Sequence, residues 1–465
     1  MNTFSARGYL VLLSAWALAS CGGGSSSANI VTNAPTSIAL SPLTVSLAPA
    51  GTQQLTVTGT FSDGTTKTLA AGGESFKSSN TNVASVSSAG LVTVAANAAI
   101  GDTATISVTD TTSGVVSATA ASTVVTVVAD VGPTANSGSA ATATAKNNAQ
   151  CAPPDIDTAY YWEIGDVSGT LVSGTHADAA GATLDEKGNP ISADTSVWAI
   201  ASGSKWIYST YVIEVRGSAN ILNNTDPSIP YLNFTSGYTY LGNFPPTTNC
   251  PSLGSVDDCL AGLPTTPNPA TTGHFYYDSG HMEEHATKFM GLGGAGILDL
   301  KNAVQAALGS DIKLVYSIPL LAAGIDTTAS DYALFLRRIL SGQYKMSATL
   351  SANPVCTNST VSGCAATAGQ SPIANASSNT EAWHYSMGHW IEDDPVVGDG
   401  AFSSPGALGF YPWIDKNKTY YGIIARANTN VTGQEFEGYK SAVCGRLIRR
   451  AWETGIEQTG AAPVL

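Results

Sequence analysis

The sequence predicts two folded domains: an all-β sandwich, then a larger α+β domain in which helices flank an antiparallel sheet and form a helical subdomain. Residues 35–130 consist of short segments that alternate apolar and polar side chains between turn residues, and they contain no Trp or Tyr. Residues 151–465 contain all six histidines and suffice for a large core. Strand-like segments at both ends of this second region enclose helical ones, which favours the α+β class.

The start of the chain predicts export and a lipid anchor. An apolar segment, Tyr9–Ala17, is followed by Leu18–Cys21, whose sequence resembles a bacterial lipobox. This pattern predicts a signal peptide over residues 1–20, lipidation of Cys21 and a Gly/Ser-rich tether over residues 21–34. The alternative is an ordinary secretory signal cleaved nearby. The residue after the cysteine is not Asp, which favours the outer membrane or the cell surface within the cell envelope. The apolar run is too short to span a bilayer, so we expect membrane contact only through the anchor.

The first domain is predicted from alternating strands with turn signals between them at Asp63-Gly64 and Ser113-Gly114. The expected strands are Thr36–Leu40, Gln54–Phe61, Ala104–Thr109 and Thr123–Val128. Five motifs follow one another in the order Ile38-x-Leu-Ser-Pro42, Ala48-Pro-Ala-Gly-Thr52, Phe61-Ser-Asp-Gly-Thr65, Ser78-Ser-Asn80 and Gly90-Leu-Val-Thr-Val94. Together they resemble a group-2 bacterial immunoglobulin-like domain, which implies a spacer or adhesive module. We place this domain at 35–130 and expect a polar linker at 131–150.

The second domain, residues 151–465, is predicted to begin and end with antiparallel strands and to close with a helix. The expected strands are Tyr160–Ile164, Gly169–Gly174, Leu408–Ile414 and Tyr420–Ala427, and the expected helices start at Ser202 and cover His281–Met290, Asp299–Leu308, Asp331–Leu340 and Glu435–Glu453. This order places a helical insertion between the two parts of a sheet.

The cysteines and the charge exclude several functions. Six cysteines remain if Cys21 is lipidated, and an even number in an exported chain favours disulfides over a metal cluster. They are Cys151, Cys250, Cys259, Cys356, Cys364 and Cys444, and their pairing stays open among 15 possibilities. A formal net charge of −14, with 20 Lys and Arg, argues against nucleic acid as a partner.

The segment Trp198–Tyr211 contains a Ser-x-x-Lys motif, Ser202 and Lys205, at the predicted start of a helix. This spacing puts the hydroxyl and the amine on one helical face, and the helix N-terminus favours a developing alkoxide. A desolvated lysine has a lowered pKa and can accept the serine proton. Ser310 and Lys313 have the same spacing but lie in a turn before a predicted strand, so Ser202 is the candidate nucleophile. A helix cap with a solvated lysine is the structural alternative.

Further segments follow in the order Tyr231-Leu-Asn-Phe-Thr-Ser-Gly237, Phe275-Tyr-Tyr-Asp-Ser-Gly280, Ala323–Phe335 and Ser403–Trp413. Together with Ser202 and Lys205, these segments and their order resemble the serine β-lactamase, penicillin-binding protein and family VIII esterase superfamily, nearest to its class C-like branch. The resemblance implies an acyl-enzyme on Ser202, with Lys205 and Tyr277 moving its proton. It also implies an oxyanion hole from the N–H groups of Ser202 and Ala407.

Departures from the family pattern bear on the substrate. Tyr231-Leu-Asn233 fits the family's Tyr-x-Asn motif more literally than Tyr277 does, but Thr235-Ser-Gly237 assigns it to an earlier segment. Ser279 stands where the motif has Asn, and Ser404 and Gly406 stand in a segment that carries no cation for a substrate carboxylate. We therefore expect neutral substrates, held by Ser279, Ser404, Gly406 and an aromatic wall of Trp383, Tyr385, Trp390, Phe410, Tyr411 and Trp413.

Two other motifs point elsewhere. His281-Met-Glu-Glu-His285 fits an inverted zinc-protease pattern, but its third ligand is missing, with Glu381 a lone candidate, so we expect no metal. Gly291–Gly296 lacks the strand and the acidic residue of a dinucleotide site, and we expect no cofactor.

The sequence therefore predicts an exported serine hydrolase that cleaves an ester or amide of a small molecule or a polymer, with esters preferred. The alternatives are a β-lactamase or D-Ala-D-Ala carboxypeptidase-like enzyme, and a surface adhesion or binding protein with an inactive hydrolase-like domain.

Overall fold

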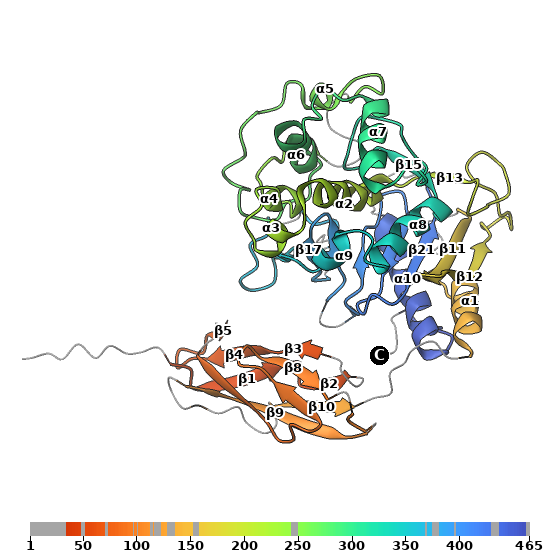
Figure 1. Cartoon of the computed structure of the whole chain (residues 1–465). Coiled ribbons are helices and arrows are strands. Elements are labelled where there is room, and N and C mark those ends of the chain that lie inside the picture. Colours follow the sequence, from red (N-terminus) through yellow and green to blue (C-terminus); the bar gives the residue numbers. More distant parts are fainter. Residues whose placement is uncertain are drawn as a thin grey trace, which may run out of the picture. The chain divides into compact units, whose positions relative to one another are not determined.

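The computed structural model describes residues 34–47, 52–69, 73–95, 97–99, 101–111, 115, 122–127, 135–151, 158–242, 250–367, 370–373, 381–394, 397–428 and 437–461. These residues form two compact units, and we treat each unit by itself (Figure 1). The predicted signal peptide, Cys21 and the Ser113-Gly114 turn lie outside the described residues.

The first unit is an all-β domain, as predicted. Alternation along its longest strand shows why it folds: Ala104, Ile106 and Val108 are buried while the residues between them are not. Its strands pair as β1–β4–β5, β2–β10–β9–β6 and β3–β8–β7. They are β1 (Ser37–Ser41), β2 (Thr44–Leu47), β3 (Thr52–Gln54), β4 (Thr56–Thr60), β5 (Thr66–Thr68), β6 (Glu74–Ser78), β7 (Ala84–Val86), β8 (Leu91–Val94), β9 (Thr103–Asp110) and β10 (Thr123–Val127).

The second unit is built on an eight-stranded antiparallel sheet in the order β12–β11–β21–β20–β19–β18–β17–β16. Its strands are β11 (Tyr160–Asp166), β12 (Gly169–His176), β16 (Val355–Cys356), β17 (His384–Ser386), β18 (His389–Ile391), β19 (Phe402–Ser403), β20 (Tyr411–Ile414) and β21 (Tyr421–Ala425). A three-stranded sheet pairs β13 (Val197–Ala199) and β14 (Leu314–Tyr316) with β15 (Ile325–Thr328). The predicted first and last strands thus meet side by side, because β11 pairs with β21.

Two helices cover opposite faces of the large sheet. Tyr421 accepts a hydrogen bond from Arg337 of α8 (Ala329–Leu340). Its neighbour Gly422 packs against Trp413, whose ring also lies against Gly445 of α10 (Glu437–Thr454). Since successive strand residues point to opposite faces, α8 and α10 lie on opposite sides of the sheet.

Most of the other helices gather on one side of the sheet as the expected helical subdomain (Figure 1). They are α2 (Ser204–Arg216), α3 (Ala219–Leu222), α4 (Ile229–Leu232), α5 (Val256–Leu260), α6 (Gly280–Met290), α7 (Ile297–Leu308) and α9 (Met346–Thr349). Among the described residues, no helix has both the length and the hydrophobicity needed to cross a bilayer.

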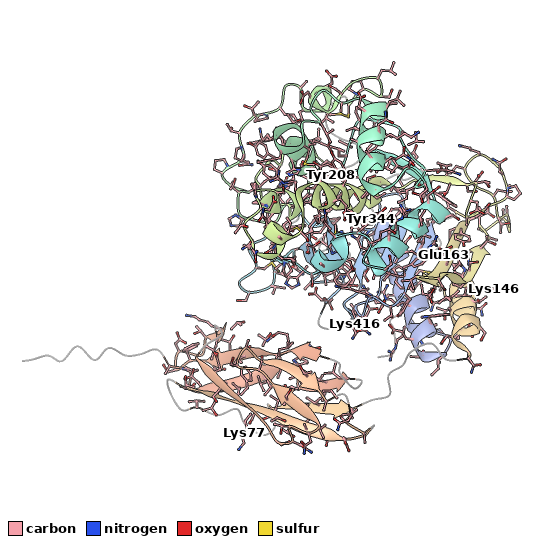
Figure 2. All side chains as sticks on the ribbon, in the orientation of Figure 1. Lys77, Lys146, Glu163, Tyr208, Tyr344 and Lys416 are labelled. Atoms are coloured by element: carbon pink, nitrogen blue, oxygen red, sulfur yellow. A yellow bond between two sulfur atoms is a disulfide. The ribbon has the colours of Figure 1, made fainter. Side chains whose placement is uncertain are left out.

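The expected linker at 131–150 is wrong for its second half, which forms helix α1 (Ser137–Asn147) beside α10 (Figure 1). Its buried residues, Ser137, Ala140, Ala141, Thr144 and Ala145, recur at helical spacing, while Lys146 points outward (Figure 2). The composition concealed this helix because its buried face consists of small residues. Asn148 closes it against the end of the chain, donating to the carbonyls of Gln458 and Gly460 at 2.7 and 3.0 Å.

Three disulfides join Cys151 to Cys444, Cys250 to Cys259 and Cys356 to Cys364. The first links the end of α1 to the middle of α10 and therefore fixes both helices at one edge of the domain. The sequence left the pairing open. In the two short loops, each cysteine is bonded to its neighbour in the sequence, Cys250 to Cys259 and Cys356 to Cys364.

Candidate active site

Ser202 lies in a tight turn, a 3-10 helix over Ala201–Gly203, directly before α2. Ala201 has a φ of 42°, in a region that non-glycine residues rarely occupy and that concentrates at functional sites. Three hydrogen bonds hold the turn. Ile200 N–H donates to Ile325 O, Ile325 N–H donates to Ser204 Oγ, and the Tyr332 hydroxyl donates to Gly203 O. The backbone before the helix is therefore fixed from two other elements, β15 and α8.

Lys205 lies one helical step further along, as its spacing predicts, and its Nζ is 3.0 Å from Ser202 Oγ. A second hydrogen bond of 3.0 Å runs from Nζ to the carbonyl of Ala322. The two side chains are buried, with 4% of Ser202 and 1% of Lys205 exposed. Burial lowers the pKa of Lys205 to about 7, while the carboxyl groups of Glu283 and Asp278 act in the opposite direction. The amine can therefore shed and regain a proton near neutral pH.

Tyr277 is the third member of the cluster. Lys205 Nζ lies 4.9 Å from the centre of its ring. Its buried hydroxyl makes no hydrogen bond within the described part of the chain, and the nearby Ser202 hydroxyl only partly offsets the rise in its pKa that burial causes. Tyr231, the alternative tyrosine, lies in α4 and stacks on Tyr238, so the structure brings Tyr277 and not Tyr231 to Lys205.

The segment after β19 lies against the serine turn. Ser404 Oγ donates to the main-chain carbonyl of Ser202 at 3.0 Å. Gly406 approaches so closely that a Cβ there would lie 2.2 Å from Ile200 O, which explains the glycine. Ala407 follows, half-buried, in a turn closed by Gly409 N–H on Gly406 O. The backbone of 404–407 and that of 200–202 are therefore in direct contact.

Aromatic rings surround the cluster, but not all of those expected. Rings within 6.1 Å of the Tyr277 ring, centre to centre, are Phe234, Tyr385 and Trp390. The other expected wall residues have different partners. Trp383 contacts Glu381 and Trp390, and Phe410 contacts Tyr332. Tyr411 contacts Arg449, and Trp413 contacts Tyr420. Trp383 thus lies behind Trp390, and Tyr411 and Trp413, which occupy alternate positions of β20, face α10.

The two histidines of the zinc-like motif are engaged in hydrogen bonds at both ring nitrogens. His281 lies 2.6 Å from Ser236 Oγ and 3.0 Å from Tyr276 O. His285 lies 2.8 Å from the Tyr208 hydroxyl and 2.9 Å from Ser228 Oγ. Burial lowers the pKa of each to about 3. Glu381 accepts from Trp383, Tyr439 and Arg446 instead, and no three candidate ligands cluster among the described residues.

Two buried carboxyl groups beside Lys205 were not singled out from the sequence. Asp278 accepts the N–H groups of Gly242 and Gly280, and Glu283 accepts those of Leu321 and Ala322. Burial raises the pKa of both to about 7. The available signal was that an acidic residue, Asp278, follows Tyr277 directly, and that Glu283 lies at the start of the helix that comes next.

Comparison with protein-family models finds a match for the first unit. Residues 34–124 match the model of the bacterial Ig-like domain (group 2), so the first unit is an Ig-like domain. No curated protein sequence matches this chain.

Solved structures similar to the chain are described as β-lactamases, a simvastatin synthase, a hydrolase with acyltransferase activity and a penicillin-binding protein homologue. Simvastatin synthase (LovD) from Aspergillus terreus is 14% identical, with a TM-score of 0.44, over 69% of this chain and 98% of that one. EstCE1, a hydrolase with promiscuous acyltransferase activity, is 10% identical, with a TM-score of 0.41, over 67% and 99%. A penicillin-binding protein homologue from Pyrococcus abyssi is 11% identical, with a TM-score of 0.42, over 66% and 76%.

Proposed function

We propose that the second domain is a serine hydrolase that cleaves an ester or an amide through an acyl-enzyme on Ser202. The observation that carries this proposal is the 3.0 Å contact between Lys205 Nζ and Ser202 Oγ, in a buried site where the lysine pKa falls to about 7. A buried amine that is neutral at physiological pH is a base, and a serine hydroxyl at hydrogen-bond distance from it is an activated nucleophile.

In the proposed reaction the neutral amine of Lys205 accepts the hydroxyl proton as Ser202 Oγ attacks the substrate carbonyl. The N–H groups of Ser202 and Ala407 stabilise the oxyanion. Tyr277, whose hydroxyl has no hydrogen-bond partner among the residues that the structure describes, passes the proton to the leaving group as the carbonyl–oxygen or carbonyl–nitrogen bond breaks. Water then attacks the acyl-enzyme by the reverse proton route, releasing the acid and regenerating Ser202.

The substrate class follows from the charges around the serine. Residues 402–407, Phe-Ser-Ser-Pro-Gly-Ala, are all uncharged. The hydroxyl of Ser404 is occupied by the carbonyl of Ser202, whereas that of Ser279 is buried with no partner in the described chain. With Phe234, Tyr385 and Trp390 near Tyr277, this composition suits neutral acyl groups and favours esters over anionic β-lactams.

We further propose that the enzyme is displayed on the cell envelope through a lipid on Cys21, with the Ig-like domain as a stalk. The match to a bacterial Ig-like domain and the three disulfides support an extracytoplasmic location.

A fluorophosphonate probe tests the serine directly, because it reacts covalently with activated serines. We expect the wild-type protein to be labelled and Ser202→Ala to remain unlabelled while keeping the wild-type circular dichroism spectrum. Ser310→Ala is the matched control, since Ser310 and Lys313 repeat the motif in a turn, and it should be labelled like the wild type. Equal labelling of wild type and Ser202→Ala would refute the assignment. No labelling of either would favour a binding protein with an inactive hydrolase-like domain.

A further inference from the structure

Glu283 has a buried carboxylate at which two backbone amides converge. It lies in the first turn of α6, and its Oε2 and Oε1 accept the N–H groups of Leu321 and Ala322 at 3.0 and 2.9 Å. Its side chain is completely enclosed. Each oxygen accepts one amide, whereas a glutamine would place an NH2 donor where one of the two oxygens accepts.

Ala322 is held at both of its backbone polar groups. Its N–H donates to Glu283, and its carbonyl accepts from Lys205 Nζ at 3.0 Å. The turn around it is tight: Gly324 N–H donates to Leu320 O at 2.7 Å, and a Cβ on Gly324 would lie 2.4 Å from Ile318 O. Because the turn is rigid, the position of the Glu283 carboxylate determines the position of the Ala322 carbonyl.

Lys205 makes two hydrogen bonds, to Ala322 O and to Ser202 Oγ. A lysine side chain has four rotatable bonds, so one contact leaves the amine free to swing, whereas two contacts fix its direction. The carbonyl of Ala322 therefore determines where the amine lies relative to the serine.

We propose that Glu283 is a positioning residue that holds the Ala322 carbonyl against Lys205 and so keeps the amine directed at Ser202. The importance of that direction for turnover rests on the proposed function. Glu283 touches neither Ser202 nor the space around its hydroxyl; it acts through the peptide backbone and through its charge.

The titratable groups that face this carboxyl group come from several elements. Tyr208 and Lys205 reach it from α2 and Tyr316 from β14, and the pKa of each responds to its charge. Tyr208 is labelled in Figure 2 within the helical subdomain. Asp278 acts on Lys205 in the same sense as Glu283. Removing the Glu283 charge and releasing the Ala322 carbonyl both disfavour the protonated amine, so both lower the pKa of Lys205.

The test compares Glu283→Gln with Glu284→Gln in the full chain. Glu284 is the adjacent residue on α6, and its partner is Lys288 at 2.8 Å, so it is a matched control. An NMR titration of isotope-labelled lysine, with the resonance assigned by its loss in Lys205→Met, reports the amine without needing turnover. We expect Glu283→Gln to move the Lys205 titration below the wild-type midpoint, and Glu284→Gln to leave it unchanged.

Kinetics on a neutral ester give the second readout. Misplacing a catalytic group costs on the order of a hundredfold in kcat, so we expect that loss in Glu283→Gln with KM altered less than about threefold. Glu283→Asp keeps the charge but shortens the side chain by one methylene, so its kcat should lie between those of the wild type and Glu283→Gln. If Glu283→Gln does not fold, Glu283→Asp decides.

An unchanged Lys205 titration in a folded Glu283 variant would overturn the inference, whatever the kinetics show. Absence of Ser202-dependent turnover in the wild type would instead overturn the proposed function, and the titration would still decide the positioning role.

Discussion

The hydroxyl of Ser404 donates a hydrogen bond to the main-chain carbonyl of Ser202 across 3.0 Å. This bond connects the turn that carries the candidate nucleophile to the segment that carries Ala407, the second candidate oxyanion donor. Two amides can stabilise one oxyanion only if they point at the same place. The Ser404–Ser202 bond and the close approach of Gly406 to Ile200 keep the two backbone segments in register.

Ser404→Ala removes this bond and leaves the Ser202 carbonyl without the hydroxyl donor. The Ser202 carbonyl still accepts the Ser204 N–H, and a single hydrogen bond contributes about 0.5–1.5 kcal/mol net, so we expect the free energy of unfolding to fall by that amount. We also expect kcat to fall about tenfold, because the oxyanion donors lose alignment. Urea denaturation and steady-state kinetics measure the two effects, and wild-type values for both would show that the bond does not align the site.

Activity should depend on pH through Lys205. Its pKa of about 7 means that the amine is protonated and inactive as a base in acid, and neutral above that pH. We expect kcat/KM for an uncharged ester to rise with pH and to level off, with an apparent pKa near 7. A flat profile between pH 5 and 9, measured with substrate in limiting amount, would contradict the role of the amine.

Lys205→Met should inactivate the protein and stabilise it at neutral pH. The ordinary lysine pKa of 10.5 applies in the unfolded chain, so between pH 7 and 10.5 the unfolded state binds more protons than the folded state. Keeping the buried lysine therefore costs on the order of 4 kcal/mol at pH 7, partly offset by its two hydrogen bonds.

The direction of this effect can be tested, because the free-energy cost of burying Lys205 disappears as the pH rises from 7 to 10.5. The stability advantage of Lys205→Met over wild type should shrink steadily from pH 7 to pH 10. Urea unfolding of both proteins at pH 7, 8.5 and 10 measures it, and an advantage that grows with pH would mean that the lysine pKa is not lowered.

Tyr277→Phe and Tyr231→Phe distinguish the two tyrosine assignments. Loss of a positioned proton donor costs about two or more orders of magnitude in rate, which we expect for Tyr277→Phe. Tyr231 lies in α4 against Tyr238 and His285, so Tyr231→Phe should retain most activity. The reverse order of rates, with both variants folded, would show that Tyr277 is the wrong residue.

Neutral esters should be better substrates than β-lactams. A carboxylate-binding site gains from a charge-assisted hydrogen bond, and residues 402–407 supply no cation. We expect turnover of nitrophenyl butyrate to exceed that of nitrocefin by a wide margin under identical conditions. Faster turnover of nitrocefin would favour the β-lactamase or carboxypeptidase alternative and would place the carboxylate partner elsewhere in the chain.

The sequence predicted those helices and strands in which large apolar residues recur at a regular spacing. In α8, the large buried residues are, as expected, Tyr332, Phe335, Leu336 and Ile339. The sequence did not predict α1, because alanine and threonine on a buried helical face look like a polar linker. The spacing of Ser202 and Lys205 was enough to bring them together, because the 3-10 turn that holds Ser202 continues directly into α2, which holds Lys205 three residues on.

Partners that are distant in sequence could not be predicted in the same way. Glu283 meets Ala322 only because α6 packs against the turn before β15, and no local pattern encodes that contact. The aromatic wall was partly misassigned because the direction of side chains on β20 depends on which face of the strand meets α10. Phe410, Tyr411 and Trp413 lie close to Ser404 in the sequence, but this did not determine whether their side chains lie close to Ser202.

The contacts of Asn148 with Gln458 and Gly460, together with the bond between Cys151 and Cys444, hold α1 and α10 together at one corner of the second unit. Because that link is covalent, a cut in the backbone anywhere between Cys151 and Cys444 would leave both helices in one molecule.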